Sequence, residues 1–300
     1  MFHDALVPFA ERRIIRMEKF KEDGETYGSH NCHVNALDVM MKRYNIDTSL
    51  LYRYNFNINM AEDHHHFGGN VPYLDIIDFI EKIYGLEIIK CDMYDIPTEQ
   101  LVILPLDSFW LPYIENRSEI NIGEQLHYVL AEILVDGKVS TYDPYYKMYH
   151  QFERDEIVDY WRVFTQPIVY LKNTQNEKIE NEKIFPYLLN VDYKTKYKNF
   201  IEELKKVFIT LEEKGFDNNE LFKRFFSCVK SILIIRKKHF EVSNNSIEIA
   251  EKITNSWASL IKEMCRLSVK NDNNLERLYG IISKTMELEI DYLKQMEKCI

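Results

Sequence analysis

Glycine and proline are scarce in this 300-residue chain, which has only nine and eight of them. Such low counts exclude collagen-like and low-complexity sequences. Long apolar runs are missing too, and none approaches the ~18 consecutive residues of a membrane span. Residues 1–4 lack the basic start of a signal peptide, and the five cysteines are odd in number and irregularly spaced. We therefore expect a cytoplasmic protein in a reducing compartment, with no membrane contact.

Runs of basic residues are also short. The net charge is −10, and the longest basic run is residues 236–238. A negative surface repels phosphate backbones, so we expect no nucleic-acid partner, and the same field favours a cationic small molecule. Three consecutive histidines at 64–66 are a poor metal site because neighbouring side chains diverge and zinc ligands are usually spaced along the chain. We expect a polar loop there and no metal.

The sequence changes character near residue 170. No proline follows Pro186, and apolar residues recur at helical spacing in the last hundred residues. Before that point, helix-like and strand-like segments are mixed, with the strands late. We predict an α+β chain with two domains, 1–170 and a helical domain 171–300. The segments expected to be helical are 32–44, 76–84, about 200–211, 221–235, 250–267 and 275–296, and those expected to be strands are 86–91, 101–110, 126–135 and 138–142.

One cysteine stands where a helix is expected to begin. Residues 24–31 have the composition of a loop, and Ser29 or Asn31 is a suitable N-cap. Cys32 then lies in the first helical turn, where unpaired backbone N–H groups and the helix dipole stabilise an anion. A thiolate is the nucleophilic form of cysteine, so Cys32 is a candidate nucleophile. The alternative is a small buried side chain that only fills space. The neighbouring His33 is expected to point about 100° away along the helix, which makes it a poor base.

A histidine and an aspartate lie on two neighbouring predicted strands. His127 begins one strand, and Asp143, followed by Pro144, ends the next. Proline offers no N–H to the sheet, so the strand stops at Asp143. A carboxylate that holds one imidazole nitrogen while the other faces a thiol is the arrangement of a cysteine nucleophile with its base. We predict Cys32, His127 and Asp143 to be a catalytic triad.

The length of the turn between these two strands decides whether His127 and Asp143 lie on the same face. Asp136-Gly137 is typical of a two-residue turn. That turn would put His127 and Asp143 on opposite faces of the ribbon, because side chains alternate along each strand. The triad therefore requires a longer loop or a β-bulge in this hairpin.

These segments together resemble a known family. Cysteine at a helix start, His-Tyr-Val-Leu at 127–130 and Tyr-Asp-Pro at 142–144 resemble the papain-like cysteine peptidases. The pattern is most similar to that of the bacteriocin-leader peptidases and the butirosin-type acyltransferases. Residues 106–113 are similar to an Asp-aromatic-Pro-Tyr stretch of those acyltransferases. Their helical C-terminal part is similar to the segments that carry Arg236, His239 and Trp257.

The resemblance implies acyl transfer in the assembly of antibiotics and other specialised metabolites. An acyl group held as a thioester on a phosphopantetheinyl carrier protein would pass to Cys32, and a small amine would then take it as an amide. A member of this family from closthioamide assembly uses a small diamine. No other cofactor is implied. The alternatives are a cysteine peptidase or amidase with the same triad, and a non-catalytic helical adaptor.

Other residues are assigned to substrate and to the oxyanion. Asp107 is a candidate for recognising a cationic amine, and Trp110 and Tyr113 are candidates for a pocket that excludes water. Papain-like enzymes commonly carry a glutamine six residues before the cysteine, where this chain has Thr26. We expect the oxyanion hole to combine the Cys32 backbone N–H with Thr26, Ser29, His30 or Asn31, of which Thr26 and Asn31 are the leading candidates.

Overall fold

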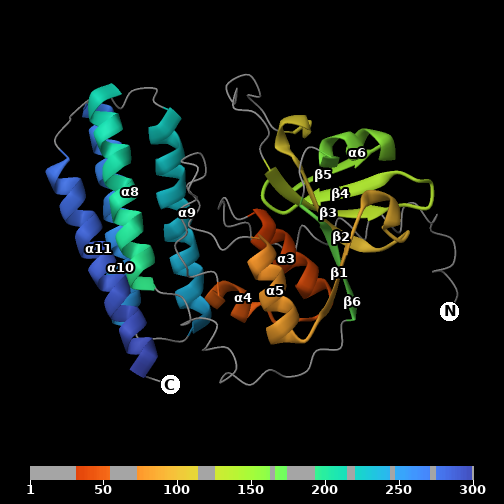
Figure 1. Ribbon diagram of the computed structural model, residues 1–300, viewed down its shortest axis with the longest axis horizontal. Coiled ribbons are helices and arrows are strands. Elements are labelled where there is room, and N and C mark those ends of the chain that lie inside the picture. Colours follow the sequence, from red (N-terminus) through yellow and green to blue (C-terminus); the bar gives the residue numbers. More distant parts are fainter. Residues whose placement is uncertain are drawn as a thin grey trace, which may run out of the picture. The chain divides into compact units, whose positions relative to one another are not determined.

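The structure, a computed structural model, describes residues 32–54, 73–113, 126–162, 166–173, 193–214, 220–243, 247–270 and 275–298. It has an α+β fold, which confirms the predicted class (Figure 1). The described residues fall into two units. The first, called the sheet unit here, comprises residues 1–48 and 85–177, and the second, the helical unit, comprises 49–84 and 178–300. No helix in the described part of the chain is long and apolar enough to cross a membrane.

The sheet unit contains one six-stranded sheet whose paired strands are antiparallel. Its strand order is β1-β6-β2-β3-β4-β5. The strands are β1 Glu87–Cys91, β2 Leu101–Asp107, β3 Leu126–Ile133, β4 Val139–Asp143, β5 Met148–Phe152 and β6 Ile168–Asn173, with short 3₁₀ turns η1 Met93–Asp95 and η2 Ser108–Trp110. The predicted strand 101–110 ends early because the Asp107 carboxylate accepts a hydrogen bond from the Phe109 N–H and starts η2 (3.0 Å).

Helices cover both faces of this sheet (Figure 1). α6 (Arg154–Arg162) lies against β2 on one face, and α3 (Cys32–Arg43) lies against β2 and β3 on the other. Every second residue of β2 and β3 points to the α6 side and belongs to the core there, as expected for a sheet with both faces buried. This core includes Val102, Leu104 and Leu106 of β2, Val129 and Ala131 of β3, and Ile157 and Val158 of α6. Cys32 is the first residue of α3, the helix that packs against β2 and β3.

The hairpin between β3 and β4 has the irregularity that the triad requires. Ile133 pairs with Val139, and Leu134 N–H donates to the carbonyl of Lys138 (2.8 Å), which leaves a loop of residues 135–137. Gly137 closes a turn by donating to Leu134 O (2.9 Å) and has a φ of +87°. A turn followed by a left-handed glycine is the three-residue hairpin loop with a bulge. The register shift puts positions 127 and 143 on the same face, so the predicted longer loop is confirmed.

Gly137 gives a direct test of this loop. Replacing it with alanine is expected to destabilise the sheet unit by about 1–2 kcal/mol, because an L-residue at positive φ is strained. Nothing lies within 4 Å of the added Cβ, so steric contact adds no cost. Gly280, in the helix Glu276–Lys298, is the control, because Gly280→Ala should be neutral or stabilising there. Urea denaturation measures both variants, and an unchanged midpoint for Gly137→Ala would contradict the assigned turn.

The helical unit contains the four predicted C-terminal helices, each longer than the apolar periodicity indicated. They are α8 Tyr193–Lys214, α9 Glu220–Ser243, α10 Ile247–Lys270 and α11 Glu276–Lys298. Their buried faces form one core that includes Phe200, Phe208, Phe225, Trp257 and Leu278. Two helices from earlier in the chain, α4 (Ser49–Tyr54) and α5 (Tyr73–Tyr84), cluster with this unit, although the sequence analysis placed both in the domain 1–170.

Candidate active site

The candidate nucleophile is the first residue of α3. Cys32 is buried, with 8% of its surface exposed, and it hydrogen-bonds with His127. The first turn of a helix has backbone N–H groups without helical partners, and their partial positive charge favours an anion. The predicted placement of Cys32 at a helix start is therefore present in the structure.

The imidazole of His127 lies between the thiol and a carboxylate. His127 is the second residue of β3, where it pairs with Leu106 of β2. Its Nε2 lies 2.7 Å from Oδ2 of Asp143, the last residue of β4. Because Nε2 is engaged by the carboxylate, Nδ1 is the ring nitrogen left for the thiol. The structure thus brings together the three residues that the sequence analysis assigned to a triad.

The electrostatics of the site favour an ion pair. Burial alone would raise the pKa of Cys32, but the charge and hydrogen bond of His127, followed by those of His33, lower it from 9.0 to about 6. Burial would lower the pKa of His127, but the charges of Cys32 and Asp143 and the hydrogen bonds to both raise it to about 10. Between these values the pair is a thiolate beside an imidazolium, which is the reactive form of a cysteine nucleophile.

The Asp143 carboxylate is fully buried and accepts four hydrogen bonds from residues that the structure describes. Its Oδ1 accepts from the backbone N–H groups of Tyr145 (2.8 Å) and Tyr146 (3.2 Å). Its Oδ2 accepts from His127 and from the hydroxyl of Tyr113 (3.0 Å). Each of these donors makes a directed hydrogen bond to a carboxylate oxygen. Asp143 is therefore held in position from both oxygens.

Tyrosines that the sequence analysis did not assign surround the imidazole. The rings of Tyr145 and Tyr146 lie 6.1 and 5.8 Å from the His127 ring, centroid to centroid. Burial and the charges of the site raise the pKa of both phenols, that of Tyr146 to about 12, so they stay neutral beside the ion pair. The signal for them was the turn after Asp143, because an aspartate commonly bonds backbone N–H groups a few residues ahead.

A second imidazole also contacts the thiol. His33 hydrogen-bonds with Cys32, and its ring packs edge-on against Tyr128 at 5.5 Å. His33 is thus close enough to lower the pKa of the Cys32 thiol, while its expected role as a poor base stays a prediction. Angular spacing along the helix describes where a side chain leaves the backbone, and it does not account for the packing against Tyr128 that places the ring.

The three predicted substrate residues lie in different surroundings. Asp107 is buried, caps η2, and shares a sheet face with Tyr128, whereas His127 alternates to the other face. Trp110 is 45% exposed and stacks on Tyr160 of α6 at 5.5 Å. Tyr113 alone bonds to the triad, through Asp143. The substrate roles of all three stay predictions.

Several predicted residues lie outside the described residues. These are both leading oxyanion candidates, Thr26 and Asn31, and the three histidines at 64–66. Within the described ranges, no group of three or more His, Cys, Asp or Glu side chains is arranged to hold a metal ion.

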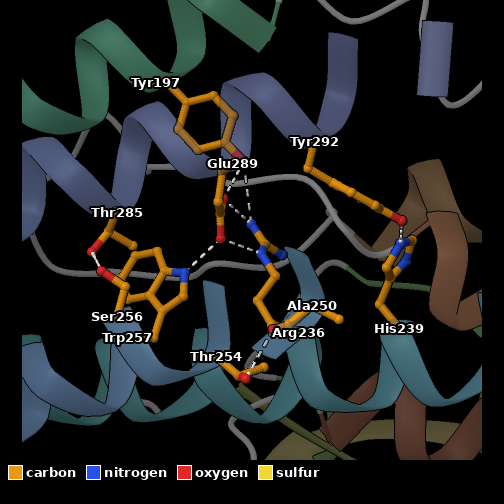
Figure 2. Close-up of polar contacts among 10 residues, drawn as sticks. All are labelled: Tyr197, Arg236, His239, Ala250, Thr254, Ser256, Trp257, Thr285, Glu289 and Tyr292. Carbon is orange, nitrogen blue, oxygen red and sulfur yellow. Dashed lines mark hydrogen bonds and ion pairs between the residues drawn. The ribbon is translucent and has the colours of Figure 1, made fainter. Parts of the chain in front are cut away.

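The helical unit holds a separate buried polar cluster, centred on Glu289 of α11 (Figure 2). Arg236 of α9 donates to both carboxylate oxygens, with Nε to Oε1 at 2.6 Å and Nη2 to Oε2 at 2.8 Å. Trp257 of α10 and Tyr197 of α8 donate to the same carboxylate. Arg236 and Trp257, which the resemblance singled out, thus meet at one residue. His239 bonds Tyr292 instead (2.7 Å).

No protein-family model matches this chain, and no curated protein matches it significantly.

Proposed function

We propose that this protein is a papain-like cysteine acyltransferase that forms an amide from a carrier-bound acyl thioester and a small amine. The observation that carries the proposal is the buried Cys32–His127–Asp143 arrangement, with the thiol at a helix start and the imidazole bonded to both partners. A thiolate–imidazolium pair is suited to attack on an acyl carbon. The choice of a thioester donor and an amine acceptor comes from the resemblance to the butirosin-type acyltransferases.

The first step transfers the acyl group to the protein. The Cys32 thiolate attacks the carbonyl carbon of the carrier thioester, and the bond to the phosphopantetheine sulfur breaks. The departing thiolate takes the proton that His127 carries, which leaves a neutral imidazole beside the new thioester. Both the broken and the formed bond are thioesters, so the exchange needs little driving force.

The second step releases the amide. The amine attacks the Cys32 thioester, and His127 accepts a proton from the amine nitrogen as the carbon–sulfur bond breaks. The thiolate–imidazolium pair is restored, and the product leaves as an amide. Asp143 keeps Nε2 protonated throughout, so Nδ1 is the nitrogen that exchanges protons at the sulfur. No further cofactor takes part, and the partners are the carrier protein and the amine.

Acylation of Cys32 is the direct test. Incubation with an acyl-loaded carrier protein is expected to add the acyl mass to Cys32, and Cys32→Ala should abolish the adduct. The matched control is Cys265→Ala, because Cys265 is an exposed free cysteine of the helical unit and its loss should leave the adduct intact. Adding a diamine should then remove the acyl group as an amide product.

Other outcomes separate the alternatives. Hydrolysis of peptide substrates without amine-dependent product would replace the transferase with a peptidase. Failure of acyl thioesters and peptides alike to react with Cys32 would support the non-catalytic adaptor and overturn the proposal.

A further inference from the structure

Tyr113 shares an acceptor atom with the imidazole of His127. Its hydroxyl donates to Asp143 Oδ2 at 3.0 Å, and His127 Nε2 lies 2.7 Å from the same oxygen. Burial, followed by the Asp143 charge and the hydrogen bond to it, raises the pKa of Tyr113 well above its ordinary value. The phenol is therefore a permanent donor to this oxygen.

We propose that Tyr113 is a positioning residue of the triad, which sets the strength of the hydrogen bond between Asp143 and His127. The proposal assigns Tyr113 a role other than substrate contact, and it rests on the proposed function for its catalytic meaning. An oxygen that accepts two hydrogen bonds shares its negative charge between them. The Tyr113 bond thus limits how strongly the carboxylate pulls on the imidazolium proton.

The effect of the Tyr113 hydrogen bond on His127 can be measured separately from any role of Tyr113 in holding the Asp143 carboxylate in place. Oδ1 is already fixed by the backbone N–H groups of Tyr145 and Tyr146, so the carboxylate stays in place when the phenol is removed. The ring of Tyr113 also packs near the Tyr146 ring, at 5.9 Å, and phenylalanine keeps that packing. Within the part of the chain that the structure describes, the titratable groups that face His127 are Cys32, Asp143, Tyr145 and Tyr146, and all of them remain in a Tyr113→Phe variant.

The measurement is the titration of the His127 ring by nuclear magnetic resonance, in protein with isotopically labelled histidine. The His127 signals are assigned by their loss in His127→Gln. Tyr113→Phe is expected to raise the His127 midpoint by about one pH unit and to move its Nε2 proton downfield, because the whole acceptor strength of Oδ2 then falls on the imidazolium. Loss of packing alone would produce neither change.

One further variant should shift the His127 midpoint in the opposite direction, and another serves as the control. A fluorinated tyrosine at position 113 has a more acidic phenol and donates more strongly, so the His127 midpoint should fall. Tyr146→Phe removes a hydroxyl from the same aromatic group while its backbone bond to Asp143 remains, so the midpoint should stay constant. An unchanged midpoint in Tyr113→Phe, or an equal shift in Tyr146→Phe, would overturn the proposal.

The titration uses the resting protein and needs no acyl donor. A shift in Tyr113→Phe without acylation of Cys32 would support the role of Tyr113 and contradict the proposed function. Acylation of Cys32 with no shift in the variant would do the reverse.

Discussion

Replacing His127 with alanine is expected to reduce the alkylation rate of Cys32 near pH 7 by about 100-fold. In the intact site the pKa of Cys32 is lowered to about 6, so the thiolate is present above that pH and is lost as the pH falls through it. Without the imidazolium of His127 the largest lowering influence is lost, so burial moves the pKa of the thiol back towards its ordinary 9.0 against the smaller effect of His33. Near neutral pH the thiolate fraction then drops from nearly all to about one part in a hundred.

The pH profile gives the same result in a second form. In the intact protein, alkylation of Cys32 by iodoacetamide should rise with a midpoint near pH 6 and then level off. In His127→Ala the rise should move up towards pH 9. The rate is read from the peptide that carries Cys32, because the chain has five cysteines.

Cys91 is the internal control for this experiment. Burial, with the charges of Asp95 and Asp92, raises the pKa of its thiol to about 11. Its slow alkylation should be the same in the intact protein and in His127→Ala. A His127→Ala variant that alkylates at Cys32 as fast as the intact protein would exclude the ion pair, and with it the assigned nucleophile.

The backbone of the site could be predicted because each residue stands at the end of a local element. Cys32 follows a loop composition and opens an apolar helical pattern, and Asp143 precedes a proline that ends a strand. Strand alternation then showed that a two-residue turn would separate His127 from Asp143. The structure has the expected longer loop, which comprises three residues and includes Gly137.

The surroundings of the site could not be predicted in the same way. Tyr113 lies thirty residues from Asp143, and no periodicity in the sequence relates the two. Residues 148–152 and 168–173 form β5 and β6, which the sequence analysis missed. Both are short, and β6 takes its place between β1 and β2 through pairing with distant segments, which local patterns do not encode.

Glu289 shows the same limit in the helical unit. Glu289 is buried, whereas Glu287, two residues before it, is exposed. The local sequence around them does not show which of the two carboxylates is buried. The burial of Glu289 is explained by its partners, because donors from α8, α9 and α10 all reach it (Figure 2). A buried charge is tolerated where such partners replace water, and here each comes from a different helix.

Glu289→Ala is expected to destabilise the helical unit by about 3–5 kcal/mol, because it leaves the fully buried Arg236 guanidinium without its carboxylate. Urea denaturation followed by far-ultraviolet circular dichroism measures the loss. Glu287→Ala, two residues away on the exposed face of α11, should leave the midpoint unchanged.

A double variant separates the uncompensated charge from the lost packing. Replacing both Arg236 and Glu289 with methionine removes the charge pair together, and it should cost less than the sum of the two single replacements. The physical reason is that most of the damage in each single variant comes from the charge left behind in an apolar core. Strictly additive costs would show that Arg236 and Glu289 act independently, and would contradict the role of Glu289 as the residue that joins the four C-terminal helices.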